Sequence, residues 1–308
     1  MYITQYRRCP SCGHNTGKFL RVVKSFNFLK CQNCTLVYVD ADPKAILDFN
    51  KYEEKVFFQY LFVTTTSTMA YYDGILDKVV KHFGRKDIRI LDFGCGAGFF
   101  LRRAKIKNIP AVGVDFSPYS ELAKKYFQLD IEISDIFESS FPPNSFDVIF
   151  SHGVHEHLDQ MDKITQKLHS LLKLGGILIL SALPNYSTLT IHIFNNFFNN
   201  YPPGHINFFT TGSMSKFLKL MKFEPMKVKT YGIDFLWPLV YKLQNIKAKI
   251  LGKKKDEEVK DIDISNVNME DIKVKPFHHL LVSIYNVFHL PNMGHHVEAW
   301  AIKKENLE

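Results

Sequence analysis

One short stretch constrains the fold of this chain more than any other. Residues 88–101 read IRILDFGCGAGFFL. The first four residues are typical of a buried strand, and a helix opens at Phe99. Between them lie Asp92 and the glycines Gly94, Gly96 and Gly98. Because glycine at a strand–helix junction lets a ligand approach the backbone, the stretch predicts a ligand-binding loop in an α/β fold.

The spacing of the glycines and the acid before them narrow the choice of ligand. The dinucleotide fingerprint places its third glycine five residues after the first, but here that position is Phe99 and the glycine comes one residue early. An aspartate directly before the loop also disfavours a pyrophosphate. Asp92 suits a cationic ligand, and S-adenosylmethionine carries an ammonium and a sulfonium group and no phosphate.

The sequence DFGCGAG at 92–98, followed by VGVDFS at 112–117, resembles the class I S-adenosylmethionine-dependent methyltransferases. The resemblance covers about residues 67–231 and a terminal strand. It implies a Rossmann-like sheet, mostly parallel with an antiparallel last strand, and S-adenosylmethionine as cofactor. It also implies that Asp92 and the three glycines bind this methyl donor and that Asp115 accepts both ribose hydroxyls. The alternative, a glycine turn without a ligand, does not explain the downstream acid and strand.

The rest of the chain alternates between strand and helix patterns. Helical spacing covers 72–83, and another helix face runs from Met161 to Leu172 and is closed by Gly175-Gly176. Predicted strands cover residues 111–114, 131–133, 146–150, 177–180, 225–231 and 297–302. Such alternation predicts a parallel sheet that binds ligands at the carboxyl ends of its strands.

Polar groups follow several of these strand ends. By resemblance, Asp135 and Ile136 bind the adenine and Phe116 flanks it. His152, which follows the fourth strand, is also assigned to the donor site. Taken alone, Asp115 is equally typical of a helix cap and Asp135 of a turn. Only the position of the two acids at successive strand ends favours a ligand-binding site.

Histidines mark the expected acceptor side. SHGVHEHL at 151–158 resembles the family segment that passes the methyl donor. We predict that His157 and His205 handle the acceptor's proton or orient its hydroxyl, since a histidine near its ordinary pKa suits a hydroxyl acceptor. The alternative is that His157 only orders its loop. His-Glu-His lacks the i, i+4 spacing of a helical metal pair, so no metal is predicted there.

Four cysteines predict a separate N-terminal module. Cys9 and Cys12 form one CxxC pair, Cys31 and Cys34 form another, and eighteen residues separate them. This is a four-cysteine zinc pattern, and the strand-like residues between the pairs resemble a zinc ribbon. Four protein ligands leave no open position, so the zinc is expected to be structural and to contribute about 10–16 kcal/mol of binding. A thioredoxin-like redox site needs one CxxC opening a helix, and cytosolic disulfides are rare.

These features divide the chain into a zinc-ribbon-like module (1–40), a linker (41–66), a methyltransferase domain (67–231), an insertion (232–295) and a final strand with a tail (296–308). The aromatic segment at 184–210 is expected to cover the acceptor pocket. Within the insertion, the charged run at 253–258 reads as a solvated face. The apolar stretch at 280–288 reads as a helix on the domain, a dimer contact or a membrane-surface contact.

Charge and hydropathy bear on partners and location. The net charge is +8, and residues 1–40 hold six Lys or Arg against one acid. No apolar run approaches the roughly 20 residues of a membrane span, and the first residues lack the apolar core of a signal peptide, so a cytoplasmic location is the default expectation.

The expected function is methyl transfer from S-adenosylmethionine to a small molecule, such as a sugar or polysaccharide precursor or a secondary metabolite. One alternative is a ribosomal RNA methyltransferase whose ribbon meets phosphates through Arg7, Arg8, Lys18, Arg21, Lys24 and Lys30. Another is a non-catalytic interaction protein with a relict donor fold. The oligomeric state does not follow from the sequence.

Overall fold

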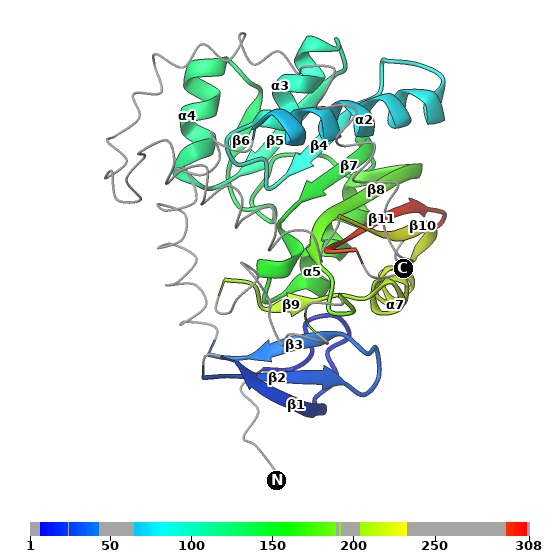
Figure 1. The fold of residues 1–308 in the computed structure, drawn as a ribbon. Coiled ribbons are helices and arrows are strands. Elements are labelled where there is room, and N and C mark those ends of the chain that lie inside the picture. The colour runs from blue at the N-terminus through cyan, green and yellow to red at the C-terminus, as the bar shows by residue number, and fades with distance from the viewer. Residues whose placement is uncertain are drawn as a thin grey trace, which may run out of the picture.

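The computed structural model of the protein describes residues 7–23, 25–42, 65–188, 191, 204–232 and 294–306. Two sheets dominate it (Figure 1). The small sheet has the strand order β1-β2-β3-β9, and the large one has the order β10-β11-β8-β7-β4-β5-β6. Three predicted stretches lie outside the described residues: positions 43–64 of the linker, the charged run at 253–258 and the apolar stretch at 280–288. The proposed division into five parts stays a prediction.

The large sheet has the predicted Rossmann-like form. Its strands are β4 (Ile90–Phe93), β5 (Ala111–Asp115), β6 (Ile131–Ile133), β7 (Phe146–His152), β8 (Leu172–Pro184), β10 (Phe223–Tyr231) and β11 (His296–Lys303). Neighbouring strands from β6 to β8 run parallel, and β11 lies antiparallel between β8 and β10. The mostly parallel sheet with an antiparallel last strand is therefore confirmed.

Alternating residues of the central strands face two different helix layers. Helices α2 (Thr65–Phe83) and α3 (Phe99–Ile106) pack on the face that carries Ile90, Val148 and Ile179. Helices α5 (Met161–Leu171) and α7 (Thr211–Leu220) pack on the face with Leu91 and Ile149. Helix α4 (Pro118–Phe127) lies against β6. Because every central strand is buried on both faces, its sequence is a run of apolar residues rather than an alternating one.

Two local predictions were wrong. The first strand begins at Ile90, not Ile88, because its pairing with β5 and β7 starts there, and it includes Asp92. Gly175-Gly176 does not close α5, which ends at Leu171 and leads directly into β8. The glycines lie where β8 shifts register against β7, and a Cβ on Gly176 would approach the backbone oxygen of Lys173 to 2.8 Å. They belong to a bulge.

The small sheet contains the N-terminal strands β1 (Gly17–Val23), β2 (Phe26–Cys31) and β3 (Val37–Asp40), as predicted for the module. Its fourth strand was not predicted. Strand β9 (Asn207–Phe208) comes from the segment between β8 and α7 and pairs antiparallel with β3. Figure 1 shows the small sheet below the large one, with β9 on the side of the small sheet that faces the large one. The N-terminal module therefore packs directly on the segment that follows β8.

No helix among the residues that the structure describes is long and apolar enough to cross a membrane.

Candidate active site

The glycine loop connects β4 to α3 in a conformation that other residues adopt at a cost. Gly94, Gly96 and Gly98 all have positive φ, of 73°, 48° and 71°. A Cβ on Gly94 would lie 2.4 Å from Val154 Cγ2, and one on Gly98 would lie 2.4 Å from Leu129 Cδ1. The loop thus needs glycine both for its backbone conformation and for the close approach of its neighbours.

Two carboxylates face this loop from adjacent strands. Asp115, at the end of β5, accepts the backbone N–H of Gly96 at 2.8 Å on one oxygen and that of Ser117 at 2.7 Å on the other. Asp92 is 3% exposed, and its burial together with the nearby Asp115 raises the pKa of the Asp92 carboxyl well above its usual range. A cationic ligand at the loop would offset this unfavourable burial of charge.

The predicted adenine residues gather after β5 and β6. Phe116 is 72% exposed, so its ring is free to stack on a ligand. Asp135 accepts the N–H of Phe137 at 2.8 Å, and Ile136 is buried in the core below. Phe137 is 50% exposed and was not predicted. An aromatic residue four positions after the end of the apolar strand β6, and next to the predicted Ile136, was the signal that could have indicated it.

His152 ends β7 among aromatic rings rather than in open space. Its ring lies 5.6 Å from that of Tyr71 and 5.3 Å from that of Tyr72, and its Nδ1 is 2.8 Å from Ser181 Oγ. Burial lowers its pKa to about 4, so the imidazole is neutral at pH 7. Tyr71, which donates to Glu298 Oε2 at 2.7 Å, was missed because the sequence pattern marked only Tyr72 as part of the helix face.

The Glu-His-Leu segment forms a short 3-10 turn, η1 (His155–His157), and its two histidines point in different directions. His155 is fully buried, with Nε2 3.2 Å from Thr165 Oγ1. His157 Nδ1 donates to the Gly204 carbonyl at 2.9 Å, and its ring centroid is 4.8 Å from that of His205. The structure therefore brings the two predicted acceptor-side histidines together. Burial lowers the pKa of His157 to about 4 and that of His205 well below its usual range.

Backbone contacts fix this pairing. The N–H of Ile206 donates to the Glu156 carbonyl at 2.8 Å. The Asn207 amide donates to the carbonyls of His155 and Leu158 at 2.8 and 2.7 Å. Asn207 is fully buried, so these bonds satisfy a polar side chain that would otherwise be costly.

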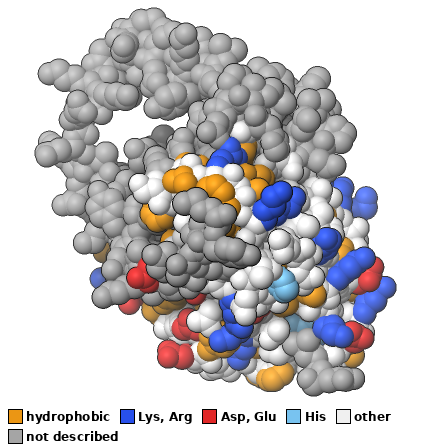
Figure 2. Space-filling model, turned by 90° about the horizontal axis from the view of Figure 1, so that it is seen from below, with side chains coloured by type: hydrophobic (Ala, Val, Ile, Leu, Met, Phe, Trp, Pro, Cys, Tyr) orange, Lys and Arg blue, Asp and Glu red, His pale blue; other side chains and the backbone are white. Residues whose placement is uncertain are grey.

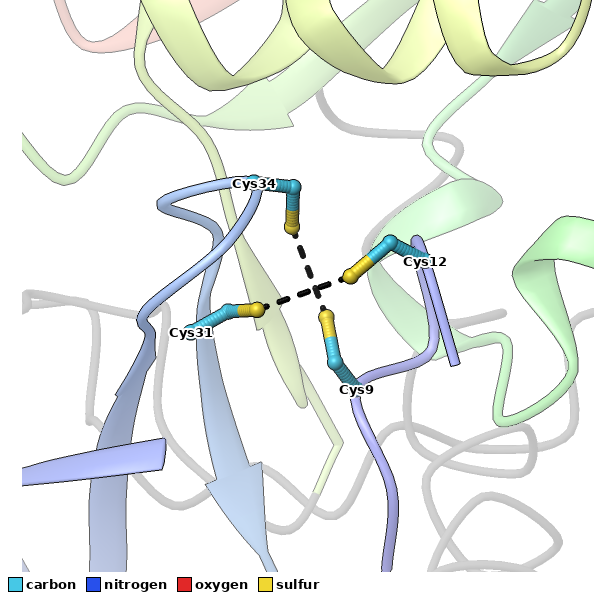
Figure 3. Close-up of side chains that lie close together, drawn as sticks. All are labelled: Cys9, Cys12, Cys31 and Cys34. Carbon is cyan, nitrogen blue, oxygen red and sulfur yellow. Dashed lines mark hydrogen bonds between the residues drawn. The ribbon is translucent and has the colours of Figure 1, made fainter. Parts of the chain in front are cut away.

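The four cysteines converge in a single cluster (Figure 3). Cys9 Sγ lies 3.5 Å from Cys34 Sγ, and Cys12 Sγ lies 3.5 Å from Cys31 Sγ. Tetrahedral thiolates 2.3 Å from one ion would be about 3.8 Å apart, so these distances fit a four-coordinate metal. Three of the cysteines are buried. The fifth, Cys95, lies apart in the glycine loop.

The N-terminal module contacts the turn that carries His157. The side chain of Arg7 is 4% exposed, pairs with Asp159 at 3.2 Å and donates to Asn207 Oδ1 at 3.3 Å. Its backbone N–H donates to Asp40 at 3.0 Å. Asn207 therefore links the N-terminal module to both flanks of η1.

Known proteins resemble this chain mainly in its central part. Residues 91–180 match the family described as a methyltransferase domain. The malonyl-acyl-carrier-protein O-methyltransferase 1 of Ilyobacter polytropus is 28% identical over 116 residues, 35% of this chain and 42% of that protein. The tRNA U34 carboxymethyltransferase of Helicobacter acinonychis is 31% identical over 128 residues, 37% of this chain and 48% of that protein. The chain thus spans less than half the length of these two curated relatives.

Among solved structures, the fold is similar to that of an S-adenosylmethionine-dependent methyltransferase of Thermotoga maritima, a possible histamine N-methyltransferase. The TM-score is 0.51 at 17% identity, and the match covers 83% of this chain and 98% of that one. The glycine loop, the acids at successive strand ends and the family match agree with one another. The chain therefore has a Rossmann-like methyltransferase fold, and its residues 91–180 match a methyltransferase domain.

Proposed function

We propose that the protein transfers a methyl group from S-adenosylmethionine to a small-molecule acceptor, such as a sugar or polysaccharide precursor or a secondary metabolite. The observation that carries the proposal is the continuity between the donor loop and the histidine pair. Val154 packs against Gly94 of the loop. Three residues further on, His157 lies against His205. A group at these histidines is therefore held close to a donor bound at the loop.

On this proposal, each part of the site has a distinct role. Asp115 accepts the ribose hydroxyls, Asp92 offsets the positive charge of the donor, and Asp135, Ile136, Phe116 and His152 complete the donor site. When bound, S-adenosylmethionine supplies an already activated methyl group. The protein mainly aligns donor and acceptor, an effect worth up to roughly 7–11 kcal/mol. His157 and His205 orient an acceptor hydroxyl or take its proton. We further propose that the four cysteines bind one structural zinc ion.

The acceptor class is tested by methyl transfer itself. Purified protein and methyl-labelled S-adenosylmethionine are incubated with lysate separated into RNA, protein and small-molecule pools. We expect label in the small-molecule pool. Label confined to the RNA pool would contradict the proposal.

The donor site is tested by substitution and calorimetry. Asp115→Ala is expected to weaken donor binding, because no other side chain at this strand end offers the ribose an acid. Asp130→Ala is the matched control, since Asp130 is exposed and outside the predicted site. Because Asp115 also accepts two backbone N–H groups, Asp115→Asn and a melting curve separate loss of the ligand from loss of the loop. Unchanged affinity in both variants would remove the assignment.

The role of the histidine pair is tested by turnover. His157→Ala is expected to lower turnover by about 10²–10⁴-fold with donor binding retained, if it acts as a general base. The control is His82→Ala, an exposed histidine on α2. A variant with near-normal turnover and a raised KM for the acceptor would make His157 a positioning residue.

RNA methylation is the second candidate, and one of the relatives named above acts on tRNA. Several basic residues invoked for phosphate binding are engaged elsewhere. Arg7 is buried in its ion pair, Arg8 pairs with Asp162 at 3.6 Å, and Arg21 donates to Tyr186 at 3.0 Å. Lys24 lies outside the described residues. Lys18 and Lys30 are exposed beside Phe19 and Val22.

The face that contains this module is mixed in character. Figure 2 views the molecule from below and shows Lys and Arg interspersed with hydrophobic and acidic side chains on its described part. Binding of RNA with an affinity that falls steeply with salt would support this second candidate. A non-catalytic role is the third candidate, and failure to bind S-adenosylmethionine in calorimetry would support it.

A further inference from the structure

Three side chains from two separate segments converge beside the η1 turn. Glu156, His157 and His205 each offer one ligand atom, and these atoms all lie within 4.8 Å of one another. His157 Nε2 lies 3.8 Å from Glu156 Oε1. Ligands 2.0–2.2 Å from one tetrahedral ion are about 3.4 Å apart, so movements of about 1 Å would close the set. The missing helical spacing of His-Glu-His is no obstacle, because the third ligand comes from another segment.

Polar atoms in this cluster lack the partners that burial normally demands. Glu156 is 2% exposed, and its Oε2 has no hydrogen-bond partner among the described residues. Among the described residues, its other oxygen, Oε1, lies 3.8 Å from His157 Nε2, which is too far for a hydrogen bond. The Nδ1 of His205 is likewise buried without a partner there. A buried carboxylate oxygen without a donor is costly. A bound cation would satisfy it.

The two segments are already held in place for such a ligand set. His157 donates through Nδ1 to the Gly204 carbonyl, which leaves the Nε2 lone pair directed away from that bond. Metal-ligating histidines commonly donate their other ring N–H in this way. The Ile206–Glu156 backbone bond and the two carbonyl contacts of Asn207 fix the spacing between the segments. Binding would therefore require little reordering.

We propose that Glu156, His157 and His205 bind a divalent transition-metal ion of the Zn²⁺ class, at a site distinct from the four-cysteine cluster. Two imidazoles and one carboxylate form the donor set of zinc sites that keep a coordination position open, whereas four thiolates make a closed site.

The role of this ion rests on the proposed methyl transfer. An acceptor oxygen in the open position would have its pKa lowered by the ion, and its proton would pass to water. The hydroxyl would then react without a strong base, and His157 and His205 would hold the ion rather than take the acceptor's proton. This places an oxygen acceptor, rather than a permanently neutral carbon acceptor, at the site.

The site itself is tested by counting metal in the full-length protein. After brief EDTA treatment, we expect the wild type to retain about one zinc per chain, held by the cysteines. After Zn²⁺ is added back and excess is removed, we expect about two. After the same treatment, the Glu156→Gln and His205→Ala variants should each contain about one zinc ion per chain. Glu138→Gln, which changes an exposed carboxylate, should bind two.

Cobalt gives a readout that does not depend on activity. One equivalent of Co²⁺ at the cysteines produces thiolate charge-transfer absorption, and a second equivalent at an N₂O site adds d–d bands without it. Melting curves establish whether each variant folds. Because two different ligands are replaced, the test still holds if one of the two variants does not fold. A wild type that binds one metal ion under all of these conditions would overturn the site.

The two proposals fail in different ways. Equal turnover by chains with one and with two metal ions would overturn the role of the ion while leaving both methyl transfer and the metal count intact. Absence of methyl transfer from a chain that binds two ions would instead contradict the proposed function.

Discussion

Replacement of Gly94 by alanine tests how tightly the donor loop and the acceptor turn are packed together. Gly94 has φ of 73°, and its Cβ would lie 2.4 Å from Val154 Cγ2. The left-handed conformation costs a non-glycine residue about 1–2 kcal/mol. Overpacking of a filled site adds about 1–3 kcal/mol. We therefore expect Gly94→Ala to lower the free energy of unfolding by about 2–5 kcal/mol.

Gly84 provides the matched control. It has a similar φ of 66°, but a Cβ there would meet nothing within 4 Å. Gly84→Ala should therefore cost about 1–2 kcal/mol at most, from the backbone alone. The difference between the two variants isolates the contact with Val154. Val154→Ala should then partly rescue Gly94→Ala, with a coupling of about 1–3 kcal/mol in a double-mutant cycle.

The assay is urea unfolding followed by circular dichroism, with the midpoint and the slope fitted separately. Calorimetry with S-adenosylmethionine on the folded variants then asks whether donor affinity falls with Gly94→Ala and recovers in the double variant. Equal destabilisation by Gly94→Ala and Gly84→Ala, or additive effects of the two substitutions in the cycle, would refute the packing argument.

Three other expectations follow from contacts described above. Mass spectrometry should find one tightly held zinc ion in the wild type. The zinc content should fall sharply in Cys31→Ser and should not change in the control Cys95→Ser. A metal-free wild type with protected disulfides would refute the zinc ribbon. Arg7→Ala should lower the free energy of unfolding by about 1–3 kcal/mol, because it leaves the buried Asn207 Oδ1 without its donor, whereas Arg8→Ala, at an exposed pair, should lower it by about 0–1 kcal/mol. Similar losses measured by urea unfolding would show that the contact between module and turn contributes little. The pKa of the Asp147 carboxyl is lowered. Burial alone would raise it, but the Arg89 N–H and the charges of Lys173 and Arg85 together lower it by more. The stability that the Asp147 carboxylate contributes is present above its unfolded pKa near 4 and is lost as the pH falls further. Asp147→Asn should therefore lower the free energy of unfolding by about 1–3 kcal/mol at pH 7 and by much less at pH 3. An equal loss at both pH values would contradict the assignment.

Local patterns predicted the elements whose residues interact with close neighbours in sequence. The strand at Ile131–Ile133 and the helix start at Phe99 match the predictions, because an apolar run and a glycine junction are visible within a few residues. The positive φ angles of the glycine loop, too, are a property of its own backbone, whereas its contacts with Val154 and Leu129 were not visible in the local sequence. Periodicity is a property of short windows, and these elements lie within them.

What could not be predicted depends on long-range pairing. Asn207 reads as part of an irregular aromatic segment, yet it is a buried strand residue because its amide reaches two carbonyls of η1 and β3 supplies the neighbouring strand. Glu156 stands in the polar run His-Glu-His, and it is buried where the chain returns at His205 and Ile206. No window of sequence around either residue contains the partners that decide its environment.

The pairing of β3 with β9 has a consequence for how the chain folds as it is synthesised. Val37 and Phe208 are 171 residues apart (208 − 37) and still form one rung of the small sheet. At typical elongation rates of about 5–20 residues per second, β3 emerges roughly 10–30 s before its partner exists. Until then it is an unpaired sheet edge, open to strands of other chains. Early closure of the cysteine cluster, all of whose ligands lie within the first 34 residues, would hold this edge in a compact nascent unit while the rest of the sheet is made.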